Sequence, residues 1–267
     1  MTLIRGTCDM PYINCNNVTI HYDEIGEGYP FFFLHGLGND NKQTREMYAP
    51  VEGVRCIIPD QRAHGLSSWD GNISFELMCR DVLALADHLG IKRFAIGGIS
   101  MGAAVSIFTR LHYPEKVTGL FLVRNAWAGE AMTDDNVRLF SALSQALGKN
   151  DITMLDDCPQ YREHRKTSSG FRDFFKDPVA LRTYRKYDMV PRLKPFDSLR
   201  QLKEIKVPVM ILANHQDFIH PFHYGELIHE AIPGSVFHET ACKRINREQY
   251  YRDLAVYLKE FFRLLGI

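Results

Sequence analysis

Residues 94–103 read FAIGGISMGA, and this stretch decides the fold. Its first residues, 94–96, form an apolar run typical of a buried strand, and a helix is expected to follow as far as about His112. The turn between them matches G-x-S-x-G, with Ser100 at its centre. A serine in this setting sits in a tight, strained turn, and the small residues around it let the neighbouring chains pass. The helix behind it offers free N–H groups to a developing negative charge.

Strand-like and helix-like segments alternate on both sides of this motif. Ser74 is expected to cap a helix whose apolar residues recur at helical spacing until Gly90. The alternation predicts right-handed crossovers and a mostly parallel, eight-stranded sheet flanked by helices. The expected strands are 12–14, 18–22, 31–34, 55–58, 94–96, 117–123, 207–212 and 236–239.

The pattern changes between residues 126 and 200, where helical segments and loops occur without a convincing buried strand. We therefore expect a core made of residues 1–125 and 201–267, interrupted by a helical insert at 126–200. The fold class predicted from the sequence is α/β.

Two further turns follow predicted strands. The first reads HGLG at residues 35–38, and its position predicts that the backbone N–H of Leu37 joins that of Met101 to form an oxyanion hole. The second reads DQRAHG at residues 60–65. We interpret its Arg62 and His64 as structural residues that hold the loop in place.

With these motifs, segments 11–125 and 202–264 resemble the α/β-hydrolase superfamily, close to its cap-bearing esterases, enol-lactonases and homologous peptidases. The resemblance implies an α/β-hydrolase fold in which residues 126–200 form a cap over Ser100. It also implies that Asp217, in the loop after strand 207–212, is the acid of a catalytic triad. The following residues keep the family's D-x-x-x-P spacing, since Pro221 lies four residues after Asp217.

The chain departs from the family pattern at the catalytic histidine. That histidine normally follows the last strand, but residues 239–246 read ETACKRIN, so Arg244 or Lys243 falls at its place. A serine hydroxyl needs a base to take its proton, and an arginine cannot accept one. His220, three residues after Asp217, is the best substitute. A desolvated Lys243 is the alternative base.

Other residues are candidates for the pocket wall. His35 and Trp127 are predicted to contact the substrate, although His35 commonly packs structurally and Trp127 fits an anchor of the cap equally well. Residues 161–200 hold 11 lysines and arginines against 5 acidic residues. Such an excess fits either a surface that steers an anionic substrate or a solvated helical face.

Composition narrows the function classes. The net charge of zero gives no indication of a nucleic-acid partner, and no apolar run is long enough to span a membrane. Residues 1–11 lack the apolar run of a signal peptide, so a cytoplasmic protein is expected. The six cysteines are scattered, which predicts reduced thiols and no metal site, and nothing indicates a cofactor.

Three functions fit the sequence. The leading hypothesis is a hydrolase that acts on a small ester, lactone or related carbonyl compound through Ser100, with a non-standard or weakened base. The first alternative is a catalytically impaired protein that binds a small ligand and signals or sequesters it without turnover. The second is a cofactor-free lyase or cyclase that uses the oxyanion pocket. The identity of the substrate and the oligomeric state stay open.

Overall fold

The computed structural model of the chain describes residues 11–15, 17–167 and 171–267, so that Cys8 and most of the first eleven residues lie outside it. Its centre is one eight-stranded sheet with the order β1-β2-β4-β3-β5-β6-β7-β8. The strands are β1 (Tyr12–Cys15), β2 (Val18–Ile25), β3 (Tyr29–Leu34), β4 (Val54–Pro59), β5 (Phe94–Ile99), β6 (Val117–Val123), β7 (Val209–Ala213) and β8 (Val236–Glu239). Strands β1 and β2 pair antiparallel, β2 pairs antiparallel with β4, and all later pairs are parallel.

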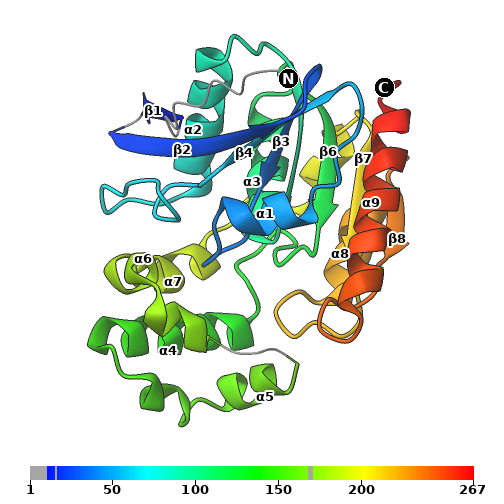
Figure 1. Cartoon of the computed structure of the whole chain (residues 1–267). Coiled ribbons are helices and arrows are strands. Elements are labelled where there is room, and N and C mark those ends of the chain that lie inside the picture. The colour runs from blue at the N-terminus through cyan, green and yellow to red at the C-terminus, as the bar shows by residue number, and fades with distance from the viewer. Residues whose placement is uncertain (1–10, 16, 168–170) are drawn as a thin grey trace, which may run out of the picture.

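Helices cover both faces of the sheet (Figure 1). Those of the core are α1 (Asn41–Met47), α2 (Phe75–His88), α3 (Met101–His112), α8 (Phe222–Ala231) and α9 (Arg247–Leu264). Helices α1 and α9 lie on one face, and α2, α3 and α8 lie on the other.

Two apolar clusters explain why the central strands read as continuous apolar runs. Along β3, Phe31 and Phe33 belong to the cluster that includes α9, whereas Phe32 and Leu34 belong to the cluster that includes α2 and α3. Because successive side chains of a strand point to opposite faces, a strand covered on both sides is apolar throughout.

The segment between β6 and β7 lies below the carboxyl ends of the parallel strands in Figure 1. It consists of α4 (Asp134–Lys149), η1 (Ile152–Leu155), α5 (Pro159–Thr167), η2 (Arg172–Lys176), α6 (Pro178–Arg182), α7 (Lys186–Met189), η3 (Val190–Arg192) and η4 (Leu199–Glu204). In the described part of residues 126–200 there are helices, turns and loops but no strand. We call this segment the cap; its exact boundaries at 126 and 200 stay a prediction.

The predicted fold is confirmed, with eight strands in a mostly parallel sheet and helices on both faces. Over the described ranges, no helix combines the length and the apolar character that a membrane span requires.

Candidate active site

Ser100 lies at the turn from β5 to α3 with a strained backbone. Its φ and ψ are 55° and −110°, and its N–H donates to the carbonyl of Val123 at 3.0 Å. Glycine is required on both sides, because a Cβ on Gly98 would lie 2.4 Å from Gly102, and one on Gly102 would lie 2.3 Å from the carbonyl oxygen of Leu34. Such strain persists only where the surroundings enforce it, and it is typical of functional sites.

Ser100 faces a cavity of about 780 Å³ that residues of both the core and the cap line. This is within the range of pockets that bind small molecules. The core contributes Gly36, Leu37, Asn39, Gln43, Ile99, Ser100, Arg124, Asn214, Gln216–His220, Cys242–Arg244 and Arg247; from the chain between β6 and β7 come Trp127, Met132, Phe140, His164, Phe171, Asp173 and Phe174.

The turn after β3 leaves one N–H free at the cavity. Gly36 donates to Gln43 Oε1 at 2.8 Å, and Gly38 donates to His64 Nε2 at 3.2 Å. Between them, the N–H of Leu37 has no acceptor among the described residues. Met101 is the first residue of α3, so its N–H has no acceptor within the helix. Neither of the two predicted oxyanion donors therefore has a backbone acceptor among the described residues.

Asp217 follows β7 and is the centre of a hydrogen-bond network. Its Oδ1 accepts from the backbone N–H groups of Ile219 at 3.1 Å and His220 at 3.2 Å. Burial alone would raise the pKa of the Asp217 carboxyl, but the charge and hydrogen bonds of His220, together with Arg124, hold it well below its usual range. Asp217 is thus an ionised, half-buried carboxylate that can orient an imidazole.

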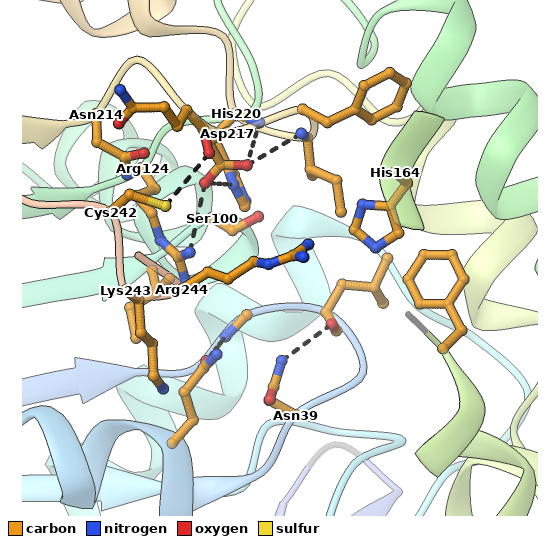
Figure 2. Close-up of a pocket in the computed structure, with 18 of the residues that line it drawn as sticks. Asn39, Ser100, Arg124, His164, Asn214, Asp217, His220, Cys242, Lys243 and Arg244 are labelled. Atoms are coloured by element: carbon orange, nitrogen blue, oxygen red, sulfur yellow. Dashed lines mark hydrogen bonds and ion pairs between the residues drawn. The ribbon is translucent and has the colours of Figure 1, made fainter. Parts of the chain in front are cut away.

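His220 is oriented by that carboxylate. Its Nδ1 lies 2.8 Å from Asp217 Oδ2, so the other ring nitrogen, Nε2, is left for a partner on the cavity side. His220 and Ser100 line the same cavity, and Figure 2 draws both among its residues. The structure therefore brings together Ser100, His220 and Asp217, the three residues that the sequence nominated as catalytic.

The loop after β8 carries cations to the cavity where the family pattern has a histidine. Lys243 and Arg244 both line it, and Arg244 extends across it towards the cap (Figure 2). There, Arg244 Nη1 donates to the carbonyl of Arg165 on α5 at 3.4 Å. No histidine occurs after residue 238, so this loop cannot supply an imidazole base.

Arg124 is a further member of the site, just past the end of β6. Its φ is 51°, and its Nη1 lies 3.4 Å from Asp217 Oδ2. Its guanidinium also lies over the ring of Tyr250, 5.8 Å from the centroid. Burial would lower the pKa of Arg124, but Tyr250 and Asp217 raise it, so the guanidinium stays charged beside the carboxylate.

The prediction that His35 contacts the substrate is wrong. Its ring is fully buried and does not line the cavity. Instead, His35 Nε2 accepts from the N–H of Gln61 at 2.9 Å, and Gln61 donates back to the His35 carbonyl at 2.6 Å. The residue joins two loops, since the turn after β3 packs directly on the turn after β4.

The turn after β4 has the structural use that we expected. Arg62 is fully buried and binds Asp81 through Nε at 2.6 Å and Nη2 at 2.8 Å. His64 contacts the carbonyl of Arg62 through Nδ1 at 2.9 Å. Both side chains hold the loop and neither lines the cavity.

Trp127 both lines the pocket and anchors the cap, the two roles that the sequence left open. It lines the cavity, and its Nε1 donates to the carbonyl of Leu193 in the cap at 3.0 Å. Its ring also packs edge-on against Phe75 of α2, with the centroids 5.4 Å apart. It is therefore a wall of the pocket and an anchor of the cap.

His164 of the cap lines the cavity, and the sequence did not predict this. Its ring, labelled in Figure 2, stacks on that of Phe171 with 4.8 Å between centroids. Burial lowers the pKa of His164 to about 4, so the ring is neutral near pH 7. No sequence signal identifies it, because the face of a short cap helix that meets the cavity depends on how the cap docks.

The excess of cations in residues 161–200 does not form the pocket wall. Among the described residues of that range, no lysine or arginine lines the cavity. One of them, Lys186 of α7, is instead buried and donates from Nζ to the carbonyl of Ala63 at 2.6 Å. Burial lowers the pKa of Lys186 to about 7, while Asp177 opposes this shift and Arg182 adds to it.

The lowered pKa of Lys186 predicts that the stability of the protein depends on pH. Its ordinary pKa is 10.5 in the unfolded chain and about 7 in the folded protein, so between these values the unfolded state binds more protons. The free energy of unfolding should therefore rise from pH 7 to pH 9, by on the order of 2 kcal/mol from this residue. Urea unfolding at the two pH values measures the rise. Lys186→Met should flatten it, whereas the exposed Lys176→Met should not; equal slopes in all three proteins would contradict the prediction.

The last features of the site concern metal ligands and cysteines. Within the described ranges, no group of three or more His, Cys, Asp or Glu residues could hold a metal ion. The five described cysteines, Cys15, Cys56, Cys79, Cys158 and Cys242, are free thiols.

Comparison with known proteins agrees with the fold described above. A family model described as "alpha/beta hydrolase fold" matches residues 29–151. The AB hydrolase superfamily protein YisY of Bacillus subtilis is 29% identical over 241 residues, which cover 82% of this chain and 85% of YisY. The bifunctional esterase/perhydrolase DCH of Acinetobacter calcoaceticus is 27% identical over 235 residues, 80% of this chain and 84% of DCH.

Among solved structures, the enol-lactonase from Burkholderia xenovorans LB400 superposes with a TM-score of 0.73 at 21% identity, covering 95% of this chain and 100% of the enol-lactonase. At that identity the likeness concerns the fold. Taken with the matched family model, the sequence relatives and the turn at Ser100, it shows that the chain has the α/β-hydrolase fold and resembles the α/β-hydrolase superfamily.

Proposed function

We propose that the protein hydrolyses small esters or lactones through Ser100, with His220 as the general base and Asp217 as the residue that orients it. The observation that carries the proposal is the 2.8 Å contact between His220 Nδ1 and Asp217 Oδ2, on a histidine that lines the same cavity as Ser100. A base held by a carboxylate beside a serine in a strained turn is the arrangement that nucleophilic catalysis needs.

The chemistry would run in two steps. His220 Nε2 takes the proton of the Ser100 hydroxyl as its oxygen attacks the carbonyl carbon, and the N–H groups of Leu37 and Met101 receive the charge on the carbonyl oxygen. The protonated imidazole then gives its proton to the leaving alcohol, and an acyl-serine remains. Water, deprotonated by His220, attacks this ester and releases the acid and the free serine.

His220 differs from the catalytic histidine of the family in its position in the chain. Its proposed role as general base is the same. It comes from the same loop as the acid, three residues later, so one tight turn supplies both members. The proposed base therefore lies after β7, whereas the family pattern places it after the last strand. Relatives named as an esterase/perhydrolase and as 3-oxoadipate enol-lactonase 2 support the ester and lactone class of substrate.

The proposal is tested by labelling with a fluorophosphonate, which reacts with activated serines. We expect the tag on Ser100, identified by peptide mass spectrometry, and no tag on the Ser100→Ala variant. Ser198→Ala, a change at an exposed serine, serves as the matched control and should label like the parent. A tag on another residue, or none on the folded parent, would count against the hydrolase and in favour of a ligand-binding protein.

A further inference from the structure

The loop after β8 lays positive charge along one wall of the cavity. Lys243, Arg244 and Arg247 all line it, and Arg124 lies deeper beside Asp217. Among the described residues that line it, two are acidic, Asp173 and Asp217. The wall nearest the loop is therefore cationic, and the cap contributes aromatic rings to the same cavity, including Phe171 and Phe174.

Most of these charges already have partners. Arg124 pairs with Asp217 at 3.4 Å, and Arg247 pairs with Glu46 at 3.5 Å. Of the acids, Asp173 pairs with Lys176 at 3.4 Å, and Asp217 is held by His220 and Arg124. The positive charge that no carboxylate balances therefore lies on the loop itself.

Arg244 and Lys243 are the two cations concerned. Within residues 11–15, 17–167 and 171–267, neither lies within 4.0 Å of a carboxylate oxygen. Lys243 lies over the ring of Tyr251, 5.3 Å from its centroid. Arg244 makes one long hydrogen bond of 3.4 Å, to the carbonyl of Arg165. A guanidinium has five N–H donors, so most of those on Arg244 are available to a ligand.

We propose that Arg244, with Lys243 beside it, binds a carboxylate on the substrate at a distance from the ester or lactone bond that Ser100 attacks. A guanidinium fork matches the two oxygens of a carboxylate, and a half-enclosed cavity screens the attraction less than open solvent does. This inference names the substrate class and rests on the proposed function.

Binding is measured first, without turnover. In the Ser100→Ala protein, titration calorimetry compares monomethyl adipate, which carries one carboxylate, with dimethyl adipate, which carries none. We expect the monoester to bind more tightly, and Arg244→Gln to reduce that preference about tenfold, since hydrogen bonds to charged groups contribute more than neutral ones. Arg200→Gln, at an exposed arginine that does not line the cavity, is the matched control and should leave the preference unchanged. The preference should also weaken at high salt.

Equal affinity for the two adipates, or a preference that Arg244→Gln leaves intact, would overturn the inference. Tighter binding of monohexyl phosphate than of the adipate monoester would overturn its carboxylate part.

Turnover separates this inference from the proposed function. The intact protein should have a higher kcat/KM for mono-4-nitrophenyl adipate than for 4-nitrophenyl hexanoate, mainly through KM, and Arg244→Gln should lower the ratio of the two values about tenfold. Serine-dependent hydrolysis of both esters without any preference would refute the anion site and leave the hydrolase standing. The calorimetric preference without serine-dependent turnover would refute the hydrolase and leave the anion site standing.

Discussion

Replacing Ser100 with alanine should reduce the hydrolysis of an activated ester such as 4-nitrophenyl acetate by about 1,000-fold or more. The nucleophile and its base act as a unit, so removal of the oxygen leaves only the contribution of the oxyanion donors and the pocket. Alanine adopts the strained turn as readily as serine, and the Ser100 hydroxyl has no hydrogen bond among the described residues that the change would break. The fold should therefore survive.

Initial rates of nitrophenol release, corrected for spontaneous hydrolysis, measure this effect. Thermal unfolding of the variant checks that the loss does not reflect unfolding, and Ser198→Ala should keep the parent rate. Equal rates for the parent and Ser100→Ala would mean that the chain does not act as a serine hydrolase. The fold would then be better explained as one that holds a ligand under its cap.

Replacing His220 with alanine should lower kcat by about 100- to 10,000-fold, the range that general-base catalysis contributes. His220 is buried, is hydrogen-bonded to Asp217 and lines the same cavity as Ser100. The exposed histidine three residues further along, His223, offers a matched control, and His223→Ala should leave kcat unchanged. Asp217→Asn should also lower kcat, because an amide no longer favours the imidazole tautomer and charge that the reaction requires.

Single-turnover and steady-state rates at neutral pH distinguish the candidate bases. If His220→Ala retains the parent kcat and Lys243→Met removes it, the base is the lysine of the loop after β8, and our assignment of His220 is wrong. If neither change matters while Ser100→Ala is inactive, the serine is activated by a group that we have not named. A histidine introduced by Arg244→His should add little, because the position beside Asp217 is already taken by His220.

The sequence by itself determined the local features of this protein. Ser74 could be recognised as a helix cap, and its Oγ accepts from the N–H of Leu77 at 3.1 Å. Glycines at 98 and 102 marked the tight turn at Ser100, and the continuous apolar runs marked strands buried on both faces. These signals lie within a few residues of what they describe, since capping, turn geometry and strand periodicity are local properties.

Only the tertiary structure decided which side chains meet in the cavity. From the sequence, His220 was one candidate base among several, because its approach to Ser100 joins residues 120 positions apart and depends on how β5 and β7 lie in one sheet. His35 seemed equally close to the site, yet packing turned it inward onto Gln61. His164 reaches the site through the docking of the cap. Its place at the cavity leaves no pattern in the chain, because contacts between distant segments are set by packing rather than by local propensity.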